Sequence, residues 1–350
     1  MPPSVFEHRI MISILVLGRD IILAIALAYV MSVCKHWTTG VLQAMVWAAY
    51  WWFQGLVFTG IWVVGHECAH GSFLPSGFAC NVIGLVCHSF LWTPYFSWKY
   101  VHHIHHRQHG LMDEDQHWIP KTRSELATAE GHASIWHYLE DTPVVALVKL
   151  IVQQIIGFPL YLLVHVTGPR HYPTFTSHFN PFSIFYAPRH RFGVILSDIC
   201  LAFMAYGLSR ATSRWGNWNI FLFYGVPCLL VSHWVTMIVY LHHNDKRVPH
   251  YRLPAWTYTR GAMATIDRDF LGWQGRFFLH DFTIFSRGYH FVRLRDQSWA
   301  FVFDLADLNT CDDPVFKSLW ENYRNCRFVE DDGNILFYKD KDGRFFAPDS

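Results

Sequence analysis

Apolar residues occur along this chain in long blocks, without the short alternating runs that are typical of soluble domains. Four blocks approach or exceed the roughly 20 mostly apolar residues that a helix needs to cross a bilayer. They are 20–36, 41–64, 194–212 and 218–241. Only a few residues separate the first block from the second and the third from the fourth, so each pair is predicted to form a transmembrane helical hairpin.

Two further apolar runs, 79–97 and 144–166, are less regular. The first contains Asn81 and His88, and the second contains Lys149 and Pro159. Polar side chains in the middle of a span are unfavourable in lipid. We therefore expect both runs to lie in the membrane interface or to pack against the helical bundle.

Two hairpins return the chain to the side of the membrane on which it starts. Segments 1–19, 65–193 and 242–350 then share that side, and they carry most of the Lys and Arg residues. The positive-inside rule places them in the cytosol. The pattern predicts an all-α integral membrane fold with four transmembrane helices (20–64 and 194–241), a cytosolic histidine-rich cap and a small C-terminal tail.

The C-terminal tail is less apolar than the rest of the chain. Residues 327–329 and 335–338 flank the turn sequence Asp-Asp-Gly at 331–333. An Asp-Gly turn between two short β-prone runs predicts a β-hairpin.

Composition supports a membrane protein and draws attention to histidine. Apolar residues make up 52% and charged residues 16% of the 350 residues, against about 25% charged in soluble domains. A net charge of +1 gives no basic surface for nucleic acid. The eight Cys form no C-x-x-C pair, so neither disulfides nor a Cys-ligated metal is expected. The 23 His are the unusual feature, because His is the commonest metal ligand.

The first histidine cluster is H-E-C-A-H at 66–70, at the end of the second apolar block. Residues i and i+4 share one face of a helix, so His66 and His70 can bind one metal ion. Taken alone, the same five residues match the H-E-x-x-H signature of zinc proteases, in which Glu67 would be the general base.

The second cluster has five His within eight residues, from His102 to His109. Packing does not explain this density, because each buried imidazole needs hydrogen-bond partners. His102, His105 and His106 have the spacing H-x-x-H-H and lie on one side of a helix. A third group, with His242 and His243, follows the fourth apolar block.

The clusters together favour one chemistry. A zinc protease uses three protein ligands and leaves the second cluster without a role. Six or more imidazoles suit two metal ions, and nitrogen ligands favour iron, zinc or copper over magnesium or calcium. An apolar substrate in the bilayer offers C–H bonds that iron and O₂ can oxidise. The aromatic run 50–53 could line a channel for such a substrate, or could form a lipid-facing belt.

Longer motifs around these clusters resemble a known family. The run WVVGHECAHGSF and the run PYFSWKY before HHIHHR resemble the first two histidine boxes of membrane fatty acid desaturases, most closely the fungal and plant delta-12 group. YLHHNDKRVPHYR, RGAMATIDRDFLGWQGRFFLHD and SLWENYRNCRFVEDDGNILFYK extend the resemblance, which covers about 4–281 and 314–340.

The resemblance implies a four-span protein of the endoplasmic reticulum membrane with a cytosolic, histidine-bound pair of iron ions. It implies an acyl-lipid or acyl-CoA substrate, O₂ as co-substrate, and electrons from cytochrome b5 and its reductase. The residues that match the family's metal ligands are His66, His70, His102, His105, His106 and His243. The acidic neighbours that are candidates to position these ligands are Glu67, Asp113 and Asp115.

The third histidine box departs from the family pattern. Its three positions fall on Ser286, Tyr289 and His290, so only His290 remains as a predicted ligand, and 282–313 does not resemble the family. Either this interval is an error in a predicted gene, or the chain is a divergent member or a non-catalytic relative. Because loss of even supporting residues weakens metal binding about 10–100-fold, we expect fewer than two irons per chain and weak desaturation.

Overall fold

The computed structural model describes residues 8–131, 142–280 and 310–345, and this part of the chain is mainly helical. The helices are α1 (Ile10–Trp37), α2 (Gly40–His70), α3 (Gly77–Phe90), α4 (Tyr95–Gln108), α5 (Arg123–Gly131), α7 (Pro143–Val164), η2 (Pro188–His190), α8 (Arg191–Trp215), α9 (Asn217–Ile220), η3 (Phe221–Gly225), α10 (Val226–His243), α11 (Tyr258–Met263), α12 (Trp273–Phe278) and α13 (Val315–Asn325). The strands are β1 (His250–Tyr251), β2 (Asp267–Arg268), β3 (Thr310–Cys311) and β4 (Ile335–Leu336).

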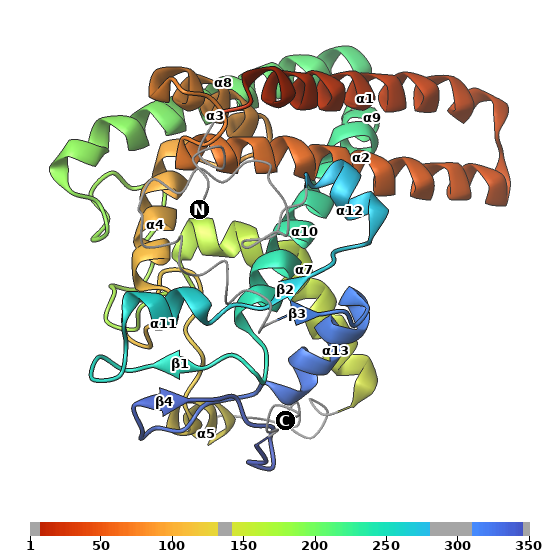
Figure 1. Ribbon diagram of the computed structural model, residues 1–350. Coiled ribbons are helices and arrows are strands. Elements are labelled where there is room, and N and C mark those ends of the chain that lie inside the picture. Colours follow the sequence, from red (N-terminus) through yellow and green to blue (C-terminus); the bar gives the residue numbers. More distant parts are fainter. Residues whose placement is uncertain (1–7, 132–141, 281–309, 346–350) are drawn as a thin grey trace.

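The first two apolar blocks lie in α1 and α2, which run side by side (Figure 1). Only two residues separate these helices, so they must pack antiparallel. The short helix α3 packs against the C-terminal part of α2, where the two helices approach each other closely at Gly65. A Cβ atom there would lie 2.1 Å from Cδ2 of His88, so only glycine fits. This contact holds α3 and the following α4 beside the histidines at the end of α2.

The second hairpin contains a π-helical turn. α8 is followed after Gly216 by α9, η3 and α10, which form one continuous helical segment. Pro227 has no N–H to donate, and the carbonyls of Leu222 and Phe223 accept hydrogen bonds from Trp51 Nε1 (2.9 Å) and Tyr50 Oη (2.7 Å). Tyr50 and Trp51 of the aromatic run 50–53 therefore bind this turn, whereas Trp52 Nε1 donates to the side chain of Gln274 (2.9 Å). None of the four residues lines the cavity described below.

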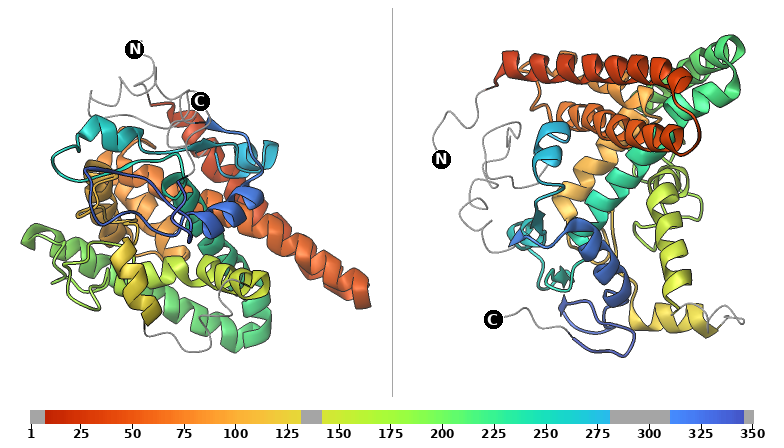
Figure 2. Two further views of the ribbon diagram at one scale, coloured as in Figure 1. Left: turned by 90° about the horizontal axis from the view of Figure 1, so that it is seen from below. Right: turned by 90° about the vertical axis from the view of Figure 1, so that its right-hand side faces the viewer.

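The prediction of four spanning helices is not confirmed by the helix count. Within the described residues, five helical segments are long and apolar enough to cross a membrane: α1, α2, α7, η2–α8 and α9–α10. The additional one, α7, covers the run 144–166, which was expected to lie in the interface or to pack against the bundle. Figures 1 and 2 show α7 inclined to α1 and α2 and reaching toward the C-terminal elements. The other ambiguous run, 79–97, is divided between α3 and the start of α4.

Of the C-terminal elements, β1, β4 and α13 lie at the opposite end from α1 and α2, whereas α12 lies against α2 (Figures 1 and 2). β2 pairs with β3 in parallel, and β1 pairs with β4 in antiparallel fashion with His250 opposite Leu336. The chain reverses at Gly333 (φ +113°), as the predicted hairpin requires. Its pairing differs from the prediction: β4 pairs with β1, while Phe328 forms an antiparallel bridge with Lys339. None of the eight cysteines forms a disulfide bond within the described residues.

A buried ionic network fixes the chain just after α10. Arg268 is 2% exposed and forms an ion pair with Asp245. Its guanidinium also donates to the carbonyl of Leu241 (3.3 Å) and to the hydroxyl of Ser318 (2.9 Å). Asn322 of α13 donates to the carbonyl of Asn244 (2.7 Å). The end of α10, which carries His243, is thereby attached to the C-terminal elements.

We expect Arg268→Leu to lower the melting temperature of the detergent-solubilised protein by about 5–10 °C. Asp245 would keep its pair with Arg247 (2.9 Å), but the buried carbonyl of Leu241 and hydroxyl of Ser318 would lose their guanidinium partner, at about 1–3 kcal/mol each. The matched control is Arg276→Leu, because Arg276 pairs with Asp269 on the surface at 3.1 Å. An exposed pair contributes about 0–1 kcal/mol. Equal melting temperatures for the two variants would contradict this interpretation.

Candidate metal centre

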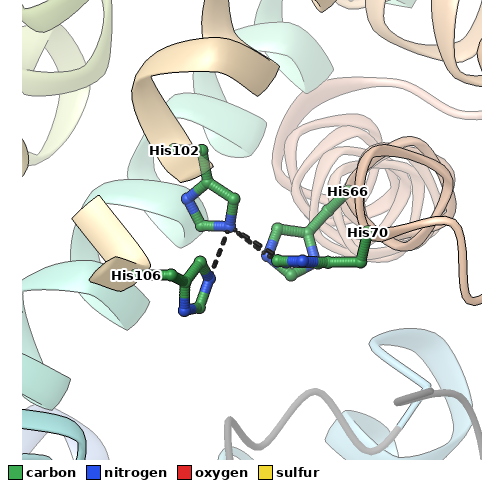
Figure 3. Close-up of side chains that lie close together, drawn as sticks. All are labelled: His66, His70, His102 and His106. Atoms are coloured by element: carbon green, nitrogen blue, oxygen red, sulfur yellow. Dashed lines mark hydrogen bonds between the residues drawn. The ribbon is translucent and has the colours of Figure 1, made fainter. Parts of the chain in front are cut away.

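Two helices bring four imidazoles to one point. His66 and His70 lie one turn apart on α2, and His102 and His106 lie one turn apart on α4. Nε2 of His102 is 2.9 Å from Nε2 of His66, 3.1 Å from that of His70 and 2.9 Å from that of His106. Figure 3 shows the four rings turned toward one another. We call these four residues the first histidine group.

The first histidine group fits a metal ion better than a hydrogen-bond network. A neutral imidazole carries one N–H, so His102 Nε2 cannot form satisfactory hydrogen bonds with three other ring nitrogens. Metal–nitrogen bonds of about 2.0–2.1 Å give nitrogen–nitrogen separations of roughly 3.0–3.4 Å around one ion. The observed separations of 2.9–3.3 Å are close to these values. A cation at the centre would use lone pairs that otherwise face one another.

A second histidine group lies beside the first. It consists of His105 on α4, His117 in the loop after α4, and His243 at the end of α10, and its candidate ligand atoms lie within 4.8 Å of one another. The rings of His105 and His117 are stacked with centroids 3.9 Å apart. His117 is also 5.1 Å from the His102 ring. α4 therefore supplies ligands to both groups, because His105 and His106 point to different sides of the same helix.

Asp115 fixes the orientation of His105. One carboxylate oxygen accepts from His105 Nδ1 (2.7 Å) and from the backbone N–H of His117 (2.9 Å), and the other accepts from the N–H of Gly110 (2.9 Å). With Nδ1 donating, Nε2 of His105 keeps its lone pair for a metal ion. Burial alone raises the pKa of Asp115, but His105 and the hydrogen bonds lower it to about 2. Asp115 is thus ionised at neutral pH.

A relay of hydrogen bonds fixes His243 in the same way. His109 Nδ1 lies 2.7 Å from the carbonyl of Gly261, which can only accept, so His109 donates there. Burial, and then the neighbouring His105 imidazole, lowers the pKa of His109 to about 4, so its Nε2 is an acceptor at neutral pH. That atom lies 2.7 Å from Nδ1 of His243. Nδ1 of His243 then donates, and its Nε2 keeps a lone pair for the second histidine group.

Glu67 has a supporting position beside His66. Its carboxylate lies 3.1 Å from His66 Nδ1 and accepts from the Ser72 hydroxyl at 2.6 Å. Its partners are thus a histidine and a serine, and its role resembles that of Asp115. The arrangement also bears on the zinc-protease alternative. His66 and His70 form one group with His102 and His106, so the H-E-x-x-H residues do not form a separate three-ligand site.

The structure brings together six of the seven predicted ligands. The seventh, His290, lies outside the described residues, together with Ser286 and Tyr289. Asp113, predicted to position a ligand, faces away: its side chain is 55% exposed and lies 3.7 Å from Arg252. The structure therefore gives Asp113 no contact with either group among the described residues. His117 was missed because it follows α4 in a loop, where no helical spacing identifies it.

An apolar cavity of about 1130 Å³ reaches both histidine groups. This volume is slightly above the roughly 300–1,000 Å³ typical of sites for small ligands. Its wall includes every member of the two groups except His70, together with Trp62 and Trp98. Apolar residues of α7 and α10 form a further part of the wall: Val152, Ile156, Leu160, Val235, Ile238 and Val239. The site can therefore place an apolar ligand beside metal-binding imidazoles.

The fold and the site together combine helices long and apolar enough to cross a membrane with two histidine groups in the wall of an apolar cavity. The chain belongs to the fatty acid desaturase family, whose model matches residues 45–292. A Delta(12) fatty acid desaturase of Mortierella alpina is 35% identical over 327 residues, which cover 85% of this chain and 78% of the relative. Members of this family are oxidoreductases.

Two plant relatives match over an even larger share of the chain. A Delta(12) fatty acid dehydrogenase of Crepis alpina is 33% identical over 94% of this chain and 87% of its own length. An endoplasmic reticulum omega-6 fatty acid desaturase of Glycine max, isozyme 1, is 33% identical over 97% of this chain and 88% of its own length. The resemblance noted in the sequence is thus confirmed.

We expect Asp115→Asn to weaken metal binding about 10–100-fold, because loss of the carboxylate releases the ring orientation of His105. The matched control is Asp113→Asn, two residues away and half exposed, which should leave metal affinity unchanged. Metal content after dialysis against graded chelator concentrations measures both. Equal losses in the two variants would show that Asp115 has no special role in positioning His105.

Proposed function

We propose that this chain introduces a double bond into the acyl chain of a lipid, at the delta-12 position that its relatives' names indicate. The observation that carries this proposal is the apolar cavity that meets both histidine groups. A flexible hydrocarbon offers no polar group at the reacting carbons, so position can be chosen only by geometry. A long apolar cavity with metal-binding imidazoles in its wall provides that geometry.

We propose two iron ions as the cofactor. His66, His70, His102 and His106 would hold one, and His105, His117 and His243 would hold the other, with His290 remaining a predicted further ligand. When bound, the iron pair supplies the activation of O₂ that C–H cleavage requires. The balanced reaction takes two hydrogens from the chain, O₂, two electrons and two protons, and gives one double bond and two waters. The electrons would come from cytochrome b5 and its reductase.

The protein's own residues have three tasks in this proposal. Asp115, Glu67 and the His109 relay keep the ligand tautomers correct. The aliphatic residues of α7 and α10 bind the acyl chain and exclude water. Burial and the neighbouring imidazoles lower the pKa of His102 well below its usual range. The lone pair of His102 is therefore free at neutral pH, as a metal ligand requires.

We propose the endoplasmic reticulum membrane as the location, with four spans and the metal centre on the cytosolic side. Of the five candidate helices, α7 is the one that we do not assign as a membrane span. It contains Lys149, Gln153 and Pro159 and forms a wall of the cavity, which suits a helix that packs at the membrane surface. Lys121 and Arg327 also line the cavity, and these cations suit an acyl-lipid or acyl-CoA substrate with a phosphate group.

We expect detergent-purified protein to retain fewer than two irons per chain. The second histidine group has three imidazoles among the described residues, whereas the first has four, and the third histidine box has lost two. After mild chelation, the iron content measured by elemental analysis should therefore fall toward one iron per chain, while the first histidine group stays loaded. Two irons that resist the same chelation would contradict the expectation.

Expression in a yeast that makes only monounsaturated fatty acids tests the proposed reaction. We expect a low yield of diunsaturated chains, and a higher yield when Ser286→His and Tyr289→His restore the third box. His102→Ala should abolish the product, because His102 contacts every other member of the first group. The matched control is His103→Ala: this ring lies 3.0 Å from the carbonyl of Ala69 and is not in either group.

The outcomes separate the alternatives. No new double bond, even with the restored box, would remove the desaturase proposal. Product from the restored chain alone would identify the present sequence as a non-catalytic relative. Loss of a peptidase activity in Glu67→Gln would instead favour the zinc-protease hypothesis.

A further inference from the structure

Two hydroxyl groups in the wall of the apolar cavity have no hydrogen-bond partner among the described residues. They are Oη of Tyr161 on α7 and Oγ1 of Thr236 on α10. Tyr161 is 8% exposed. A hydroxyl that is buried without a partner costs about 1–3 kcal/mol, so such groups in a binding cavity indicate a ligand that supplies the missing partner.

Several comparable buried hydroxyls elsewhere in the bundle are satisfied. Tyr50 and Tyr186 donate to the carbonyls of Phe223 (2.7 Å) and His178 (3.1 Å). Thr59 donates to the carbonyl of Gly55 one turn earlier in its own helix (2.8 Å). Tyr161 and Thr236 make no such bond. The hydroxyls of Ser89 and Ser97 also lack a partner among the described residues, but only Tyr161 and Thr236 of these four line the cavity.

The two hydroxyls belong to facing turns of α7 and α10. A Cβ atom at Gly157 would lie 3.3 Å from Thr236 Oγ1, so the helices touch there. Tyr161 follows Gly157 by one helical turn, and its ring lies 5.3 Å from the ring of His117. Thr236 precedes His243 by two turns on the same face of α10. Tyr161 therefore lies beside the second histidine group, and Thr236 lies two helical turns before its member His243.

We propose that Tyr161 and Thr236 form a polar subsite that binds a hydroxyl group on the acyl chain near the reacting carbons. This rests on the proposed function, since it takes the cavity to hold an acyl chain. A ligand hydroxyl can donate to one of the two groups and accept from the other. A plain hydrocarbon leaves both unsatisfied. The favoured ligand is thus an oxygenated acyl chain.

Competition binding tests the proposal without requiring turnover. The full chain in maltoside detergent is loaded with radiolabelled oleic acid, which is displaced by unlabelled oleic acid, 12-hydroxyoleic acid or 2-hydroxyoleic acid. We expect the 12-hydroxy acid to bind about tenfold more tightly than oleic acid. The 2-hydroxy acid carries the same group far from the reacting carbons and should show no such gain.

Shape-conserving variants locate the effect. Tyr161→Phe and Thr236→Val each remove one hydroxyl, and each should bring the ratio of the two affinities close to one. The controls are Tyr186→Phe and Thr59→Val, whose hydroxyls are occupied by backbone carbonyls and do not line the cavity. These should keep the tenfold ratio.

Equal affinity of the wild-type chain for oleic and 12-hydroxyoleic acid would overturn this inference alone, and would indicate that the hydroxyls hold water. A tenfold ratio that survives both Tyr161→Phe and Thr236→Val would also overturn it. Failure of every fatty acid to bind would overturn the proposed function of the cavity as well.

Discussion

The candidate metal centre depends on one constraint: the ring nitrogens of the first histidine group are held against one another inside the protein. His102 Nε2 lies about 3 Å from three other ring nitrogens, a contact that is unfavourable unless a cation occupies the centre. Helix geometry makes the contact possible, since each helix contributes two histidines one turn apart. The carboxylates of Glu67 and Asp115 lie at the outer nitrogens of His66 and His105 and orient these two rings. The rest of the fold has to supply enough rigidity to maintain this convergence.

Much of the candidate metal centre could be predicted, because the four histidines of its first group lie in two pairs with the local spacing of a helix. Two pairs separated by four residues identify His66, His70, His102 and His106 without any tertiary information. His117 could not be found in this way, because the loop that carries it is positioned by the carboxylate of Asp115. Asp113 and Asp115 are also equivalent in sequence, two residues apart in a polar turn. Only the fold shows that one faces His105 and the other faces solvent.

The same division between local and tertiary information holds for the fold. Hydropathy gave the positions of the long helices, because burial in lipid requires continuous apolar runs. It could not decide the role of α7, whose composition meets the criterion for a span but which also forms a wall of the cavity. The partner of β4 likewise depends on where β1 lies in the fold. The residues of the turn at 331–333 do not determine that position. The aromatic run 50–53 was hard to interpret because its partners, the carbonyls beside Pro227, lie more than 170 residues away.

One helix, α4, carries ligands for both histidine groups, and the two inner ones are consecutive residues, His105 and His106. The separation of these two rings is therefore set by the rise and twist of a single peptide unit, which hardly varies. Rotation or bending of α4 would displace the α4 members of both groups together. Changes in the surrounding cavity walls on α7 and α10 leave this separation untouched.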